Sequence, residues 1–168
     1  MKELSIVIVH FQTPELLKLC LKSLKHGSIG MRETNSLGSC EDPRLGYETI
    51  VIDSTVSRRA RDLIREINEA RGPDFEEVPE VGPLIKYLPF EKNLGYARGV
   101  NIGIENSTGK YILILNPDVI VTDGSIEKMI KYMDEHPDIG MLGPRVLNFN
   151  GTHQKTYFSY YKPLPVAA

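Results

Sequence analysis

Four short runs of mainly aliphatic residues, separated by segments of helical periodicity, constrain the fold of this chain more than any other feature. The runs occupy residues 4–9, 49–53, 85–89 and 111–115. Most of them are continuously apolar rather than alternating, which is typical of strands buried on both faces of a sheet. The segments between them carry apolar residues at three- and four-residue spacing, as amphipathic helices do. This alternation predicts an α/β domain with a mainly parallel sheet.

Local signals place the helices, turns and loops between these strands. Thr13 and Pro14 are suited to the N-cap and first position of a helix, and Gly72-Pro73 ends a second helix. Asp123 is placed to cap a later helix, and Asn150-Gly151 is a hairpin turn signal. The expected helices cover 14–24, 57–70 and 125–136, and a further helix follows a turn at 93–95 and ends near 109. A fifth strand is expected at 139–142, hairpin strands at 145–149 and 152–156, and surface loops at 26–47 and 72–84.

Length and composition point to one globular domain spanning residues 1–168. The formal net charge is −2, and no dense Lys/Arg stripe occurs, so nucleic acid is not expected as a partner. Of the two cysteines, Cys20 lies on an apolar helical stripe, where a reduced core thiol is expected. No apolar run approaches the length of a membrane span. We expect a cytoplasmic protein that could work at the periphery of a membrane.

Polar residues follow three of the expected strands at the point where each strand ends. His10 follows the first strand, Asp53 and Ser54 the second, and Asn116 and Asp118 the fourth. Carboxyl ends of parallel strands share one edge of a sheet, where ligands gather. Asp118, beside a proline turn, can hold a hard divalent cation that bridges phosphate oxygens, or can simply cap backbone N–H groups of the turn. For His10, a buried histidine with satisfied nitrogens is the favoured interpretation.

The other candidates also admit both a functional and a structural interpretation. Asp53 can accept hydrogen bonds from a nucleobase or ribose, or can be an ordinary strand-end turn residue. Asn93 and Gly95 lead into a helix N-terminus that favours anions, and Arg98 in its first turn can pair with phosphate or remain solvated. Asn101 lies among apolar residues, so if buried it needs either backbone or ligand partners.

Taken together, these segments resemble the family-two inverting glycosyltransferases, which have the GT-A fold. The similar segments are SIVIVHFQTPELLKLCLKSL (5–24), ETIVIDSTVS (48–57), NLGYARGVNIGI (93–104), YILILNPDVIVTDGSIEKMI (111–130) and HPDIGMLGPRV (136–146). The pattern N-x-G-[FY]-A-x-x-x-N followed by L-N-P-D is closest to the rhamnosyltransferase-like branch. The resemblance implies a Rossmann-like α/β/α sandwich, and it covers most of the chain.

The resemblance also implies a set of roles for the candidate residues. Asn116-Pro117-Asp118 would be the DXD-type motif, with Asp118 ligating Mn²⁺ or Mg²⁺. The implied donor-binding residues are Phe11, Thr13, Asp53, Ser54, Asn93, Gly95, Ala97, Arg98, Asn101 and Asn116. The implied reaction transfers a sugar, with inversion, from a nucleotide-diphospho-sugar to a hydroxyl of a saccharide or lipid-linked acceptor.

Four departures from the family pattern shape the expectations. Gln12 stands where the family often has Asn, Asp53-Ser54-Thr55 replaces commoner strand-end sequences, and the 26–47 loop is long. The family's catalytic base is a downstream Asp or Glu, whereas no acidic residue follows Arg145. We therefore assign no catalytic base and expect the chain to stop before the acceptor-binding half is complete. A non-catalytic nucleotide-sugar-binding module is the alternative, and a flavodoxin-like interaction domain is a third.

An aromatic segment closes the sequence, comprising Tyr157, Phe158, Tyr160 and Tyr161. If these side chains are exposed, they predict an interface, including self-association of the chain. A strand packed on the domain is the competing interpretation.

Overall fold

The computed structural model describes residues 2–26, 46–69 and 85–156 of the chain. Strands and helices alternate along these residues. The strands are β1 (Leu4–His10), β2 (Tyr47–Asp53), β3 (Ile85–Pro89) and β4 (Tyr111–Leu115). The helices are α1 (Pro14–His26), α2 (Arg58–Glu69), α3 (Tyr96–Glu105) and α4 (Ser125–Glu135). The α/β class predicted from the sequence is confirmed.

The four strands form one parallel sheet in the order β3-β2-β1-β4. β1 pairs with β2 along its whole length, so that His10 lies opposite Asp53, and with β4, so that Ile8 lies opposite Leu115. Every residue of the two inner strands is buried, because each has a neighbour on both sides and a covered face above and below. This explains why their sequences are mainly apolar.

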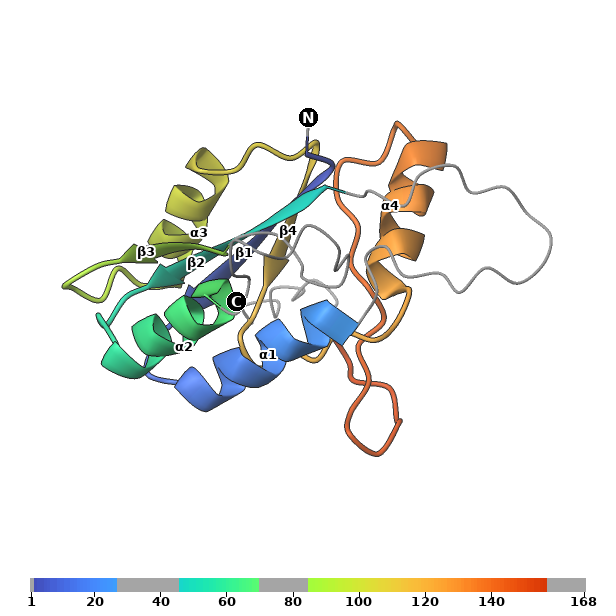
Figure 1. Ribbon diagram of the computed structural model, residues 1–168. Helices are drawn as coiled ribbons and strands as arrows, with labels where there is room; N and C mark the ends of the chain where they lie inside the picture. Colours follow the sequence, from blue (N-terminus) through green and yellow to red (C-terminus); the bar gives the residue numbers. More distant parts are fainter. Residues whose placement is uncertain (1, 27–45, 70–84, 157–168) are drawn as a thin grey trace, which may run out of the picture.

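Helices cover both faces of the sheet and make three layers, as predicted. α3 lies on the opposite side of the sheet from α1 and α2 (Figure 1). On the α1 face, Ile6 and Ile8 of β1 join a core that also takes residues from α2 and α4. On the α3 face, Val100 packs with Val9, Ile50 and Ile52. Alternate residues of β1 and β2 therefore enter two separate cores.

Two glycines allow α3 to pack closely on β1. A Cβ atom on Gly99 would lie 2.9 Å from Val9 Cγ1, and one on Gly103 would overlap Val7. Since residue numbers fall along β1 as they rise along α3, the helix runs antiparallel to the strand. The N-terminus of α3 therefore lies toward the carboxyl edge of the sheet.

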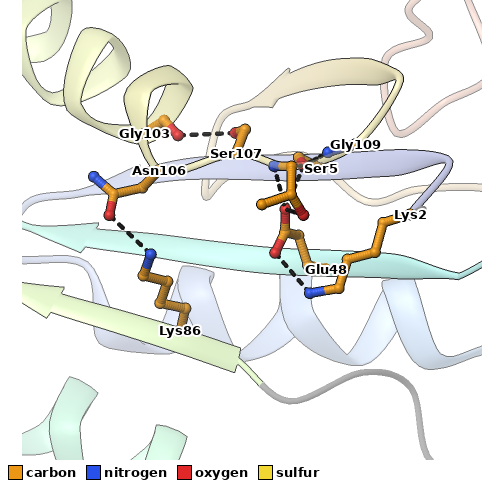
Figure 2. Close-up of polar contacts among 9 residues, drawn as sticks. Lys2, Ser5, Glu48, Lys86, Gly103, Asn106, Ser107 and Gly109 are labelled. Atoms are coloured by element: carbon orange, nitrogen blue, oxygen red, sulfur yellow. Dashed lines mark hydrogen bonds and ion pairs between the residues drawn. The ribbon is translucent and has the colours of Figure 1, made fainter.

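The opposite, amino edge of the sheet is fastened by a buried carboxylate on β2 (Figure 2). Glu48 accepts hydrogen bonds from Ser5 Oγ at 2.6 Å and from the Thr108 backbone N–H at 2.7 Å. Lys2 Nζ lies 2.8 Å from its other oxygen. Ser5 Oγ also accepts the Gly109 N–H at 2.8 Å. Lys2, Ser5, Glu48 and Thr108, here called the Glu48 cluster, tie the α3–β4 turn to the sheet.

The predicted element boundaries hold to within a few residues, with exceptions after α4. The strand predicted at 139–142 is wrong: these residues form no strand in the structure, and Met141 is exposed. Gly140 and the Gly143-Pro144 pair interrupt the apolar run, and no described strand pairs with it. The predicted hairpin shrinks to an antiparallel bridge between Leu147 and His153.

Smaller corrections concern the helices and loops. α3 ends at Glu105 rather than near 109, and α4 begins after Gly124 without a side-chain cap, so the predicted capping role of Asp123 is wrong. The ends of the predicted 26–47 loop belong to α1 and β2. The remainder of that loop, the 72–84 loop and the aromatic segment 157–161 lie outside the described residues. No helix in the described ranges is long and apolar enough to cross a bilayer.

Candidate functional site at the carboxyl edge of the sheet

The parallel topology brings the carboxyl ends of all four strands to one edge. β1 ends at His10 beside Asp53, and the Ser54 N–H donates to the His10 carbonyl at 3.1 Å. Asn116 directly follows Leu115, which lies opposite Ile8 of β1. The polar residues predicted from three strand ends thus do share this edge.

Asp53 occupies the centre of the edge and is fully buried. Its Oδ1 accepts the Thr55 N–H at 3.0 Å and the Thr55 hydroxyl at 2.8 Å, and lies 3.2 Å from His10 Nδ1. Its Oδ2 accepts the Ser57 N–H at 2.9 Å and the Tyr87 hydroxyl at 2.5 Å. These five residues are here called the Asp53 cluster. These hydrogen-bond partners of the carboxylate all come from the protein itself, and the nucleotide contact that the resemblance implies for Asp53 stays a prediction.

The hydrogen bonds settle the charge on Asp53 and the tautomer of His10. Burial disfavours the charged carboxylate, but hydrogen bonds from His10, Tyr87 and Thr55 outweigh it, so the pKa of Asp53 lies well below its usual range. The same burial and the Asp53 carboxylate raise the pKa of Tyr87. His10 Nε2 accepts the Thr13 N–H at 3.1 Å, so Nδ1 carries the proton that faces Asp53. The prediction of a buried, satisfied histidine is confirmed.

The loops that follow β1 and β2 contain two unusual features each. Gln12 and Val56 adopt left-handed backbone conformations, with φ of 56° and 50°. Such conformations are strained for a β-branched residue and cluster at functional sites. The hydroxyls of Thr13 and Ser54 are buried without a hydrogen-bond partner among the described residues. Thr13 therefore precedes α1 without using its hydroxyl as a cap, and both hydroxyls retain capacity for a ligand.

The segment after β4 is anchored on α1 and presents Asp118 to solvent. Cys20 Sγ lies 3.7 Å from the Asn116 carbonyl, and the Val121 N–H donates to Ser23 Oγ at 3.0 Å. Between these anchors, both Asn116 and Asp118 are exposed. Burial, followed by the charge of Asp118, raises the pKa of Cys20 to about 12, so this thiol is protonated and not a nucleophile.

The start of α3 brings further predicted residues to the same edge. Asn93 Oδ1 accepts the Gly95 N–H at 2.9 Å, which forms a tight turn, and Gly95 has a φ of 70° that favours glycine. Ala97 and Arg98 are exposed in the first turn of the helix. Asn101 is exposed on the next turn, so it does not need the buried partners that its apolar neighbours suggested.

Two parts of this site were not found from the sequence. The sequence pattern predicts Tyr87 only as part of a strand, whereas in the structure its hydroxyl donates to Asp53 from β3. The signal was the parallel register, which puts Tyr87 opposite Val51, two residues before Asp53 on the same face of β2. The left-handed backbone of Gln12 had an indirect signal: the family often carries Asn at this position, and Asn tolerates that conformation better than Gln.

A divalent metal fits the exposed part of this edge only if the ligand supplies most of its oxygens. The described residues contain no group of three His, Cys, Asp or Glu side chains arranged to hold a metal ion. Asp118 provides one exposed carboxylate. Mg²⁺ is commonly bound through one or two carboxylates together with substrate phosphates. The donor set therefore suits a metal–diphosphate complex rather than a metal held by protein alone.

Polar residues at the carboxyl edge of a parallel α/β sheet are where a ligand site is expected, and sequence comparison identifies the class of protein as a glycosyltransferase. Residues 5–164 match Glycosyl transferase family 2, so the chain belongs to this family. A 68-residue stretch is 35% identical to the amylovoran biosynthesis glycosyltransferase AmsE of Erwinia amylovora and covers 40% of this chain. That stretch is 25% of the length of AmsE, so the similarity spans about a quarter of this relative.

Solved structures confirm the GT-A fold. Staphylococcus aureus TarS superposes with a TM-score of 0.58 at 14% identity, over 80% of this chain and 20% of TarS. The mannosyltransferase PcManGT from Pyrobaculum calidifontis, solved with GDP-Man and Mn²⁺, superposes with a TM-score of 0.57 at 14% identity, over 79% of this chain and 33% of that protein. At this identity the likeness establishes the fold alone.

Proposed function

We propose that this chain forms the donor-binding part of an inverting glycosyltransferase that takes its sugar from a nucleotide-diphospho-sugar with the help of Mn²⁺ or Mg²⁺. One observation carries the proposal. The carboxyl edge combines the exposed carboxylate of Asp118 with two buried hydroxyls, of Thr13 and Ser54, that have no partner among the described residues. A carboxylate that can share a metal ion with phosphate oxygens suits the diphosphate end of such a ligand, and hydroxyls without a protein partner at the same edge of the sheet suit its nucleoside end.

Each part of the edge has a proposed task. Phe11, 42% exposed, offers a ring for stacking on the base, and Thr13 and Ser54 offer hydrogen bonds to base or ribose. Asn116 and Asp118 face the diphosphate. The α3 N-terminus, with Arg98 in its first turn, adds positive potential for the phosphates. The remaining predicted residues Asn93, Gly95, Ala97 and Asn101 shape this side of the donor site.

The proposed reaction is a single displacement at the anomeric carbon. The acceptor hydroxyl oxygen forms the new bond to that carbon, the bond to the diphosphate oxygen breaks, and a carboxylate base takes the hydroxyl proton. A bound divalent cation would offset the negative charge that grows on the leaving diphosphate. The described residues bind and orient the donor, and we assign none of them as the base. A saccharide or lipid-linked hydroxyl is the proposed acceptor.

Calorimetry on two aspartate variants tests the donor site. UDP-, dTDP- and GDP-sugars are titrated with and without Mn²⁺ into wild type, Asp118→Ala and Asp123→Ala. Asp123 is the matched control, because it is another exposed aspartate five positions along the same segment. We expect Asp118→Ala to weaken Mn²⁺-dependent binding by roughly 10- to 100-fold, as for loss of one charged partner, and Asp123→Ala to bind like wild type.

Two other results would count against the proposal. Metal-independent binding that Asp118→Ala leaves unchanged would remove the metal–diphosphate assignment. Binding of the donor without any sugar transfer to hydroxyl acceptors by the longest natural form of the chain would favour a non-catalytic binding module instead.

A further inference from the structure

The carboxylate of Asp53 has no hydrogen-bonding capacity left for a ligand. Two carboxylate oxygens offer about four lone-pair positions, and five protein donors already point at them. The side chain is also fully buried. A nucleotide could reach this carboxylate only by displacing one of these donors, two of which are backbone N–H groups that would be left unpaired.

The hydrogen-bond donors around Asp53 belong to the two loops that carry the Thr13 and Ser54 hydroxyls, which have no partner among the described residues. On one side, His10 donates to Asp53 and accepts the Thr13 N–H, so the carboxylate orients His10 and His10 holds the backbone of Thr13. On the other side, Asp53 accepts hydrogen bonds from the backbone N–H groups of Thr55 and Ser57. These two residues flank Val56, whose backbone is left-handed. In the sequence, Ser54 lies between Asp53 and Thr55, at the start of the loop that these hydrogen bonds hold.

Tyr87 completes the cluster from the neighbouring strand. Its hydroxyl donates to Oδ2 of Asp53, the oxygen that also accepts the Ser57 N–H. The phenol thus helps to hold the carboxylate to which both loops are hydrogen-bonded, while the position of Tyr87 is set by the pairing of β3 with β2. Loss of this hydroxyl would leave Asp53 chemically intact but less firmly oriented.

We propose that Asp53 is a positioning residue, held between His10 and Tyr87, which orders the β1–α1 and β2–α2 loops so that the Thr13 and Ser54 hydroxyls, rather than Asp53, contact the nucleoside part of the donor. This inference rests on the proposed donor site. It gives Asp53 an indirect role, since it acts on the ligand through the two loops. A direct contact between Asp53 and the base is the competing arrangement.

Tyr87→Phe separates the two arrangements because they predict opposite effects. If Asp53 positions the loops, removal of the Tyr87 hydroxyl loosens them and weakens nucleotide binding. If Asp53 contacts the base, the same change frees a lone pair and leaves binding equal or tighter. The matched control is Tyr111→Phe, since the Tyr111 hydroxyl donates to the Asp134 carboxylate at 2.6 Å, at the opposite end of the sheet.

The experiment is calorimetric titration of UDP, dTDP and GDP with Mn²⁺ into folded wild type, Tyr87→Phe and Tyr111→Phe. We expect Tyr87→Phe to raise the Kd by roughly three- to tenfold, by a similar factor for each nucleotide that wild type binds, and Tyr111→Phe to leave it unchanged. Circular dichroism at the same temperature verifies that each variant is folded, so that a change in Kd is not a change in the folded fraction.

The outcomes distinguish this inference from the function on which it rests. If wild type binds none of the three nucleotides, the donor site itself is refuted and the positioning role falls with it. If wild type binds and Tyr87→Phe binds as well or better, only the positioning role is overturned. Nitrogen-15 NMR of the imidazole gives a ligand-free measurement: the positioning role requires His10 to carry its proton on Nδ1, and an Nε2–H tautomer would contradict it.

Discussion

Two buried carboxylates on the same strand fasten opposite edges of the sheet, and they do so with different partners. Glu48, near the start of β2, is held by the Lys2 ammonium, two hydroxyls and one backbone N–H. Asp53, at the end of β2, is held by an imidazole, two hydroxyls and two backbone N–H groups, and no ammonium or guanidinium group within residues 2–26, 46–69 and 85–156 is bonded to it. The amino edge thus uses an ion pair where the carboxyl edge uses neutral donors.

The surroundings of the two clusters explain the difference. At the amino edge, the α3–β4 turn closes over Glu48, and Gly109 approaches Ser5 so closely that a Cβ atom would lie 2.5 Å from the Ser5 backbone N. At the carboxyl edge, the loops contain left-handed Gln12 and Val56, and the hydroxyls of Thr13 and Ser54 have no hydrogen-bond partner in the part of the chain that the structure describes. One edge has its polar groups satisfied within the fold, whereas the other retains strain and hydrogen-bonding capacity, as expected where a ligand binds.

The largest effect that sharpens this comparison is expected from amide replacement of the two carboxylates. Asp53→Asn places an NH₂ group against fixed backbone N–H donors whichever way the amide turns, because Thr55 and Ser57 donate to different oxygens. We expect it to lower the free energy of unfolding by about 4 kcal/mol. Glu48→Gln should cost only about 2 kcal/mol, because its amide can face Lys2, whose side chain is 47% exposed and free to turn toward water.

Urea unfolding at neutral pH, followed by circular dichroism, measures both values. Equal losses for the two variants would contradict the view that the carboxyl edge depends on neutral, fixed donors more strongly than the amino edge depends on its ion pair.

A loss of stability of intermediate size is expected at acidic pH. Despite opposing burial, the Lys2 ion pair and the hydrogen bonds from Ser5 and Thr108 lower the pKa of Glu48 to about 2. A carboxyl whose pKa is lowered by folding stabilises the protein above its unfolded pKa, and this stability is lost as the pH falls toward the folded pKa. The free energy of unfolding should therefore decline from about pH 5 downward.

The Glu48 contribution can be isolated with the same amide variant. Glu48→Gln should flatten the decline between about pH 5 and pH 2 by on the order of 2 kcal/mol, while the Asp53 contribution persists to lower pH. Urea titrations at a series of pH values test this. An unchanged slope in Glu48→Gln would show that Glu48 is not ionised within a stabilising cluster.

The same comparison shows what could be predicted from the sequence. The strands at 85–89 and 111–115 were predicted with their observed bounds, because short apolar runs favour strands, although Ile112 and Ile114 are exposed and β4 is therefore not buried on both faces as predicted. The position of Asp53 at a strand end was predictable for the same reason. Its partners were not, because Tyr87 lies 34 positions away and reaches Asp53 only through the strand order β3-β2-β1. The strand predicted at 139–142 failed because an apolar run needs a neighbouring strand as well as hydrophobicity.

The smallest effect concerns the backbone of the β1–α1 loop and uses two glutamines as a matched pair. Gln12 has a φ of 56°, whereas Gln154, also exposed, is not among the described residues with positive φ. Asn adopts the left-handed conformation several times more readily than most residues, so Gln12→Asn should stabilise the fold by about 0.5 kcal/mol, and Gln154→Asn should be neutral. Thermal unfolding of the two variants measures the difference. If both variants melt like wild type, Gln12 is not a point of backbone strain, and Val56 alone carries the left-handed strain that distinguishes the carboxyl edge from the amino edge.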